Sequence, residues 1–308
     1  MPAAAAADAD ADPPIAQIRR FNRVVTERIG ALNAQYMGRE RSLGEARVLW
    51  EIGPTGCAVA QLRERLALDS GYLSRLLRAL ERAGLVEVVP DDRDRRSRIA
   101  RLTTVGDDEW STLDARSDQL AHSLLTPLSP SQRTRLVAAM GEVERLLTAS
   151  AVQIMAVDPE HEHARWCLDR YAEELNRRSE RTFDPAVGAT ARADEVRPPN
   201  GQFVVARLYG DPIGCGAVKH HADAPAEIKR MWIAPDARGL GLGRRLLQTL
   251  ERCAREAGAA VARIETNSDL VEALTLYRAT GWREVAAFND EPYADRWLEK
   301  ALTGCARE

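Results

Sequence analysis

The residues with the clearest chemical meaning are three glycines that alternate with other residues: Gly239, Gly241 and Gly243. Glycine accepts positive backbone φ angles and lets a ligand approach the main chain closely. A helix expected to begin near Leu242 would direct its free N–H groups and the positive end of its dipole at the same point. Three arginines add positive charge around it: Arg238, Arg244 and Arg245. Because guanidinium groups bind phosphate oxygens in pairs, this pattern predicts a cradle for a pyrophosphate group.

The elements around the glycines indicate the type of cradle. The hydrophobic pattern predicts a strand, a helix and a second strand, over residues 227–233, 242–257 and 261–266. A Gly-Lys-Ser/Thr sequence and a strand-initial G-x-G-x-x-G are both missing, which argues against a Walker-type or Rossmann nucleotide site. The pattern Arg238-x-x-Gly241-x-Gly243, followed by the segment 273–282, resembles the acyl-CoA-binding signature of the GNAT acetyltransferase superfamily.

This resemblance implies an α/β domain with a mixed, splayed β-sheet that transfers an acetyl group from acetyl-CoA to an amine. Acetyl-CoA is then a co-substrate, and the main chain of the signature strand would polarise its thioester carbonyl. The residues that the resemblance assigns to acetyl-CoA are Met231, Trp232, Ile233, Arg238, Gly239, Leu240, Gly241, Leu242, Gly243, Arg244 and Asn267.

The resemblance also implies catalytic roles. Tyr277 is expected to protonate the departing thiolate, the alternative being a packed aromatic residue with a hydrogen-bonded hydroxyl. Glu227 is expected to take the proton of the amine, directly or through water, and Glu265 is the second candidate. For either carboxylate the alternative is a surface or strand-pairing role. Three further residues are expected to shape the acceptor pocket: Glu291, Tyr293 and Asp295.

A second constellation lies in the first half of the chain. An amphipathic helix is predicted that Asp69 or Ser70 can cap and that Gly84 can end. Its apolar stripe has the spacing i, i+3, i+4 and i+7 and consists of Leu73, Leu76, Leu77 and Leu80. Strands predicted over 85–89 and 99–103 then enclose an arginine-rich tip. A solvated charged face would explain the arginines, but not this order of elements.

Two shorter helices are predicted upstream, one from a capping box at 42–45 to residue 52 and one over 59–66. The order helix, helix, basic helix and hairpin predicts a winged helix-turn-helix. The sequences of the basic helix, 72–85, and of the hairpin, 92–103, resemble the MarR family of bacterial transcription regulators. The resemblance covers about residues 15–150, because long helices predicted over 15–37 and 104–150 correspond to the dimerisation helices of that family. It implies a homodimer that binds double-stranded DNA at a near-palindromic operator.

Each part of this half has a distinct expected contact with DNA. The side chains expected to enter the major groove are Ser70, Tyr72, Ser74, Arg75 and Arg78. The hairpin residues expected to follow phosphates or enter a narrow minor groove are Arg93, Arg95, Arg96 and Arg98. The resemblance also implies an Asp–Arg pair that holds the hairpin, with Asp94 and either Arg96 or Arg98 as the candidates.

Length and composition fit two soluble domains. The chain has 308 residues, of which 45% are hydrophobic and 29% charged, with a net charge of −3. It lacks a run of the roughly 18 apolar residues that a membrane span needs, and residues 1–14 lack the features of a secretory signal. Five scattered cysteines suit a reducing cytoplasm. The histidines lack a third ligand at a familiar spacing, so no metal is expected.

We therefore expect a disordered tail over 1–14, a MarR-like DNA-binding and dimerisation domain over 15–150, and a GNAT-like domain over 151–308. The predicted function is a cytoplasmic bacterial transcription regulator that is also an N-acetyltransferase of a small amine. Two alternatives remain open. The GNAT fold could sense acyl-CoA or a metabolite without turnover, or the chain could be a protein acetyltransferase recruited to DNA.

Overall fold

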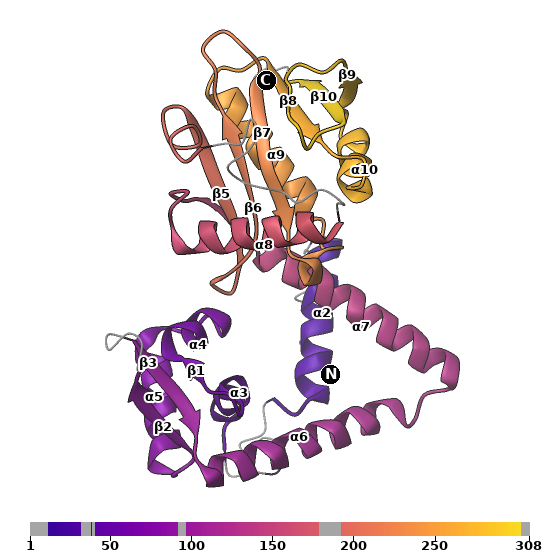
Figure 1. The fold of residues 1–308 in the computed structure, drawn as a ribbon. Helices are drawn as coiled ribbons and strands as arrows, with labels where there is room; N and C mark the ends of the chain where they lie inside the picture. Colours follow the sequence, from indigo (N-terminus) through magenta and orange to yellow (C-terminus); the bar gives the residue numbers. More distant parts are fainter. Residues whose placement is uncertain (1–11, 32–37, 39–40, 92–96, 179–191, 303–308) are drawn as a thin grey trace. The chain divides into compact units, whose positions relative to one another are not determined.

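The computed structural model describes residues 12–31, 38, 41–91, 97–178 and 192–302 (Figure 1). The chain forms two compact units, Met1–Val137 and Ala138–Glu308. The division falls inside a long helix, α7, which spans Pro130–Ala151. The domain boundary expected near residue 150 stays a prediction. In the described ranges, no helix is both long and apolar enough to cross a membrane.

The first unit is mainly helical and contains a small three-stranded sheet of order β1-β3-β2. Its elements are α2 (Pro13–Arg28), α3 (Leu43–Ile52), β1 (Cys57–Ala58), α4 (Val59–Arg65), α5 (Ser70–Arg82), β2 (Val86–Pro90), β3 (Arg98–Leu102) and α6 (Thr104–Leu125). Strands β2 and β3 pair antiparallel, from Val86 opposite Leu102 to Pro90 opposite Arg98. The order of elements is the winged helix-turn-helix that the sequence predicts. The tip of the hairpin, residues 92–96, lies outside the described residues.

Side-chain caps fix where two helices of this unit begin. Ser42 and Glu45 form a reciprocal capping box, in which each side chain accepts a hydrogen bond from the backbone N–H of the other residue. The Asp69 carboxylate accepts from the backbone N–H of Tyr72 at 2.8 Å and so begins α5. The α5 stripe is buried in the core of the unit, as its spacing predicts: Leu73, Leu76, Leu77 and Leu80.

The second unit is built on a seven-stranded sheet of order β4-β5-β6-β7-β8-β10-β9. Its elements after α7 are β4 (Gln153–Ala156), α8 (Glu162–Arg178), β5 (Gly201–Leu208), β6 (Asp211–Lys219), β7 (Ala226–Ile233), the 3-10 helix η2 (Pro235–Ala237), α9 (Leu242–Glu256), β8 (Val261–Thr266), α10 (Val271–Ala279), β9 (Arg283–Val285) and β10 (Arg296–Ala301). The mixed α/β fold agrees with the predicted class.

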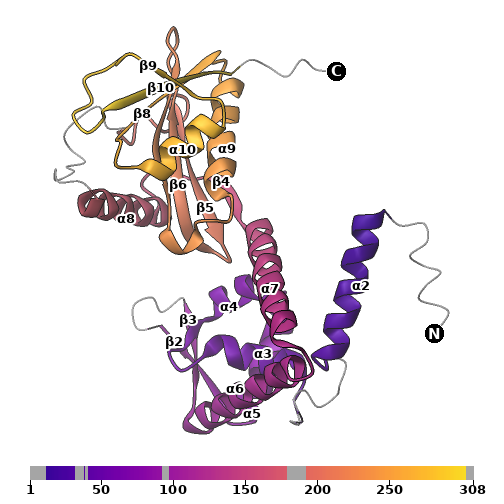
Figure 2. The same ribbon diagram turned by 90° about the vertical axis from the view of Figure 1, so that its right-hand side faces the viewer.

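Helices α8 and α9 cover opposite faces of this sheet (Figure 2). Successive side chains of a strand point to opposite faces. On β5, Val204 packs in the cluster that holds Leu250 of α9, whereas its neighbour Val205 packs in the cluster that holds Cys167 of α8. Both faces are therefore covered, and the two central strands, β6 and β7, are fixed between two layers of helix.

Strands β7 and β8 are parallel and pair over only two positions: Ala226 opposite Ala262 and Glu227 opposite Arg263. Beyond them, β7 continues to Ile233 without pairing to β8. On its other edge, the register of β7 with β6 shifts, and Arg230 there has a φ angle of 58°. The parting of β7 from β8 leaves room beside the glycine loop.

Helix α6 approaches the backbone of the preceding hairpin closely at Gly106. A Cβ atom at Gly106 would lie 1.9 Å from the carbonyl oxygen of Leu85. Replacing a helical glycine by alanine usually stabilises a helix by about 1 kcal/mol. Here we expect Gly106→Ala to lower the free energy of unfolding of the first unit by about 1–3 kcal/mol, because the backbone must move apart.

Gly141→Ala is the matched control, since Gly141 lies in helix α7 and no atom lies within 4 Å of the added carbon. This variant should be as stable as the wild type or more stable. Urea denaturation followed by circular dichroism measures both. A Gly106→Ala variant with wild-type stability would contradict the close approach of α6 to Leu85.

Candidate functional site

The glycine loop presents an open main chain at the start of α9. Gly239 and Gly241 have φ angles of 82° and 72°, and a Cβ atom at either position would have no neighbour within 4 Å. Gly241 is the N-cap of α9, and no side chain caps the first turn. The first N–H groups of a helix have no intrahelical partner. The loop therefore has the features of an anion cradle that the sequence predicts.

A cleft of about 440 Å³ lies next to this loop, between β7, α8 and α10. The predicted acetyl-CoA residues that line it are Met231, Trp232, Ile233, Arg238, Gly239, Gly241, Leu242, Gly243 and Arg244. The other two are placed elsewhere. Leu240 packs against the core beneath the loop, and Asn267 lines a second, smaller cavity.

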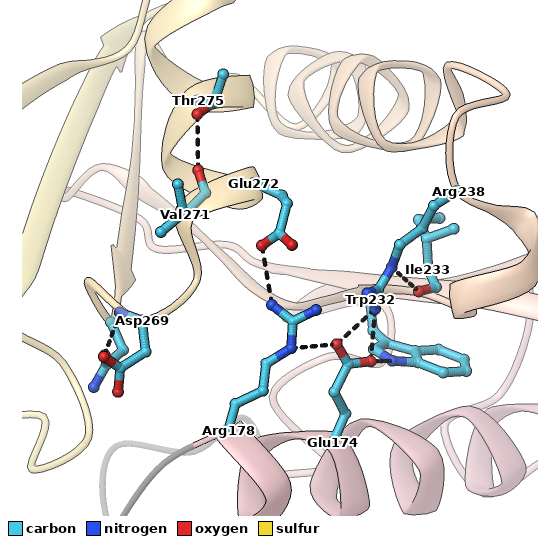
Figure 3. A network of polar contacts seen from close by, with 10 residues as sticks. Glu174, Arg178, Trp232, Ile233, Arg238, Asp269, Val271, Glu272 and Thr275 are labelled. Carbon is cyan, nitrogen blue, oxygen red and sulfur yellow. Dashed lines mark hydrogen bonds and ion pairs between the residues drawn. The ribbon is translucent and has the colours of Figure 1, made fainter.

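Arg238 is engaged in a network that holds the wall of this cleft together (Figure 3). Its Nη2 atom donates to both carboxylate oxygens of Glu174 on α8, at 2.7 and 2.6 Å, and its Nε atom donates to the Ile233 carbonyl. The Trp232 indole N–H donates to the same carboxylate at 2.8 Å. Arg178 bridges Glu174 and Glu272 of α10, each at 2.9 Å. The network thus connects α8, β7, the loop and α10.

The charge of Glu174 is stabilised inside this network. Burial raises the pKa of Glu174, but hydrogen bonds from Arg238 and Trp232 outweigh it and hold the pKa below its usual value. Sequence reasoning assigns Arg238 to the pyrophosphate and misses Glu174 altogether. The signal for Glu174 is weak, because a glutamate on an amphipathic helix is usually exposed.

The second cavity has a volume of about 110 Å³ and lies between β7 and β8. It shares several lining residues with the cleft: Tyr171, Leu175, Met231, Leu270, Ala273 and Tyr277. Tyr277 therefore lies where the two spaces meet. Its side chain is buried, and burial raises the pKa of its hydroxyl well above the usual range. Glu291 and Tyr293 line the cavity, whereas Asp295 lies outside it and accepts hydrogen bonds from Ser268.

A buried lysine separates the two candidate bases. Lys229 forms ion pairs with Glu265 of β8 and with Glu227, whose Oε2 atom lies 3.0 Å from the ammonium nitrogen. His221 lies 3.2 Å from the other oxygen of Glu227. Lys229 and Glu265 line the second cavity, and Glu227 is not among the residues that line either space. The described residues contain no group of three His, Cys, Asp or Glu side chains suited to a metal ion.

The two glutamates differ in their electrostatics. Burial raises the pKa of each, but for Glu227 the attraction of Lys229 outweighs burial and lowers the pKa. For Glu265 burial dominates, and the pKa is raised. For Lys229 burial lowers the pKa, while Glu265 and Glu227 together raise it above its usual value. Lys229 is therefore held as a cation.

The exposed face of α5 carries the predicted DNA-contacting residues. Ser70, Tyr72, Arg75 and Arg78 are exposed and Ser74 is half-buried. The Arg75 guanidinium lies over the Tyr72 ring at 5.5 Å from its centre. Arg98, at the start of β3, is also exposed. The other predicted hairpin contacts, Arg93, Arg95 and Arg96, and the predicted partner Asp94 lie outside the described residues.

Two long helices expose apolar side chains. On α2 the exposed residues follow one another at three-residue steps: Ile15, Ile18, Phe21 and Val24. On α7, where no residue is buried, the exposed apolar residues are Leu136, Val137, Met140, Leu146 and Leu147. Apolar stripes on isolated helices are typical of surfaces that pack against another chain.

Comparison with protein families identifies both units. The family model described as acetyltransferase (GNAT) domain matches residues 199–284. The model described as MarR family matches residues 40–97. The first range contains the glycine loop and the second contains α5, which are the central features of the two candidate sites.

Individual relatives match one unit or the other. The "IAA acetyltransferase" of Azospirillum brasilense is 38% identical over 109 residues, which are 34% of this chain and 70% of that protein. The "Transcriptional activatory protein BadR" of Rhodopseudomonas palustris is 41% identical over 58 residues, 19% of this chain and 33% of that protein. A crystal structure of an acetyltransferase from Streptococcus agalactiae aligns with a TM-score of 0.42 and 19% identity, over 49% of this chain and 98% of that one.

These matches agree with the geometry, which places an open glycine loop at the start of a helix in one unit and a basic helix beside a hairpin in the other. The chain is therefore a fusion that belongs to the GNAT acetyltransferases through its second unit and carries a MarR-family winged helix-turn-helix in its first.

Proposed function

We propose that the chain is a bacterial transcription regulator that also transfers the acetyl group of acetyl-CoA to a small amine. One observation carries the enzymatic part: the cleft beside the glycine loop and the smaller cavity meet at Tyr277. A thioester carbonyl and an amine that occupy the two spaces come together there. Such positioning supplies a large part of the rate enhancement of a two-substrate reaction.

The chemical roles follow from the geometry. The N–H groups at the start of α9 and the exposed Arg244 bind the pyrophosphate. Main-chain N–H groups from Met231 to Ile233, which have no β8 partner, hold the pantetheine arm and polarise the carbonyl. Tyr277 gives its proton to the departing thiolate, and its raised pKa keeps it protonated until then. Arg238 acts by positioning, since Glu174 holds it.

The regulatory part rests on α5. Arg75 and Arg78 read base edges in the major groove, and Arg98, with the hairpin arginines expected beside it, contacts phosphates. The exposed apolar stripes of α2 and α7 support a homodimer. A two-fold dimer places two α5 helices about one helical turn of DNA apart, which requires a near-palindromic operator.

The proposed transferase activity predicts turnover of an amine. Incubation with acetyl-CoA and a panel of amino acids, amino sugars and polyamines, followed by mass spectrometry, should yield an acetylated amine. Tyr277→Phe should lower the rate by about 100-fold or more, because the thiolate loses its acid, while acetyl-CoA affinity stays unchanged. Tight acetyl-CoA binding without turnover of any amine would refute the enzymatic part and favour a sensor.

The cradle gives the second prediction. Gly241→Glu should abolish acetyl-CoA binding in calorimetry, because its carboxylate would occupy and repel the site of the pyrophosphate. Gly258→Glu is the matched control, since Gly258 also has a positive φ angle, 93°, and open space around it, but lies at the other end of α9. It should bind acetyl-CoA normally. Equal binding by both variants would place the pyrophosphate elsewhere.

DNA reading gives the third prediction. Arg75→Ala or Arg78→Ala should weaken operator binding by about 1–3 kcal/mol and relax the base preference. Arg98→Ala should weaken binding to all sequences and flatten its salt dependence. Arg252→Ala, an exposed arginine of α9 in the other unit, is the control. Fluorescence anisotropy at two salt concentrations measures all four, and unchanged operator affinity in both α5 variants would exclude α5 as the reading helix.

A further inference from the structure

Glu265 has one carboxylate oxygen without a partner inside the small cavity. Its side chain is 8% exposed and lines the space between β7 and β8. Lys229 donates to the Oε1 atom. Over the part of the chain that the structure describes, the buried Oε2 atom accepts no hydrogen bond. A buried carboxylate oxygen left without a donor is costly, so this position favours a ligand that brings an N–H group.

The charges around this oxygen favour a cation. Lys229 is 5% exposed and its single positive charge faces two carboxylates, those of Glu227 and Glu265. With both ionised, this three-residue cluster has a net negative charge. Glu291 and Arg230 also line the cavity, and their opposite charges leave this net negative charge in place. A positively charged group that enters the cavity is therefore attracted to it.

The remaining walls suit an ammonium group of limited size. Three tyrosines line the same cavity: Tyr171, Tyr277 and Tyr293. Aromatic faces attract cations, and sites for ammonium groups are commonly built from them. The volume of about 110 Å³ is somewhat smaller than that of a cavity of about 150 Å³ that admits benzene. The reacting end of the acceptor is thus no bulkier than one small ring.

We infer that the acceptor is a small cationic amine whose ammonium group binds to the free oxygen of Glu265 and loses its proton there, and that Lys229 positions Glu265 for this task. This inference rests on the proposed transferase activity. It assigns the base to Glu265 in place of Glu227.

The reaction balances with the groups present. One ammonium proton passes to Oε2 of Glu265, and the nitrogen lone pair forms a C–N bond with the acetyl carbonyl carbon. The C–S bond breaks, its electron pair goes to sulfur, and sulfur takes the hydroxyl proton of Tyr277. The second amine proton restores the Tyr277 hydroxyl, and Glu265 releases its proton to water. The products are an amide, coenzyme A thiol and one proton.

Binding tests the site without requiring turnover. Calorimetry in the presence of coenzyme A should show that propylamine, an ammonium ion near neutral pH, binds at least tenfold more tightly than its uncharged analogue 1-propanol. Glu265→Gln should remove that preference and leave acetyl-CoA affinity unchanged, since Glu265 does not line the cleft. Equal binding of the two ligands to the wild type, or propylamine binding unaffected by Glu265→Gln, overturns the inference.

Kinetics then separates the inference from the proposed function. For an amine that the wild type acetylates, Glu265→Gln should lower kcat/KM by about 100-fold or more, and Glu227→Gln should lower it less. Glu299→Gln is the control, because Glu299 also forms an ion pair on this sheet, with Arg263, but lines neither space. Turnover unaffected by Glu265→Gln overturns the inference alone. Charge-selective binding through Glu265 without turnover supports the ammonium site and refutes the transferase.

Lys229 is a positioning residue, so its test is a pH profile. The charged and titratable groups around Glu265 are Lys229, Glu227 and Arg230 of β7, Tyr171 of α8, Tyr277 of α10, and Glu291 and Tyr293. Lys229 is the cation that lowers the pKa of Glu265 against burial. Lys229→Met should therefore shift the rise of kcat/KM to higher pH, and Lys229→Arg should restore it. If Lys229→Met does not fold, Lys229→Gln takes its place in the experiment. A pH profile of kcat/KM that does not shift overturns the positioning role.

Discussion

The early parting of β7 from β8 is the constraint on which both spaces of the transferase unit depend. The strands pair at only two positions, and the rest of β7 faces β8 without ladder hydrogen bonds. Main-chain polar groups away from water need partners, so this edge of β7 is suited to receive the main-chain-like amides of a pantetheine arm. If β7 and β8 paired as far as Thr266, both the cleft and the cavity would be closed. Both spaces thus depend on the early end of the β7–β8 pairing, in a sheet that α8 and α9 cover on its two faces.

Two buried glutamates of this unit, Glu174 and Glu265, have pKa values that are shifted in opposite directions. Glu174 is surrounded by Arg238, Arg178 and the Trp232 indole, so its charge is satisfied and its pKa is lowered. Glu265 forms an ion pair with Lys229, and burial raises its pKa. A buried carboxylate with full pairing serves structure, because moving or protonating it breaks several contacts. A buried carboxylate with incomplete pairing is available for proton transfer.

Local features of the fold and of the site could be predicted from the sequence, and long-range ones could not. The Asp69 cap, the leucine stripe of α5 and the positive φ angles at Gly239 and Gly241 depend on residues within a few positions of one another. The pairs Arg238–Glu174 and Lys229–Glu265 join residues 64 and 36 positions apart. Glu227 and Lys229 share one face of β7 by period two, but the register of a parallel neighbour across a long crossover has no local signal. For this reason the sequence could name Glu227 and Glu265 as candidate bases, but it ranked Glu227 first, which is the reverse of the order that the buried, incompletely paired Glu265 favours.

Helix α9 links the cradle to α7 through a side chain that the glycine pattern does not explain. Arg245 lies in the first turn of α9 and donates to the carbonyl oxygens of Ala149 and, at 2.9 Å, Val152. The last carbonyls of a helix have no intrahelical partner, and a basic side chain can satisfy them. Arg245 thus caps the end of α7, a helix that begins in the first unit, before the division at Val137 and Ala138. The first turn of α9 therefore joins the glycine loop to the end of α7 within the second unit.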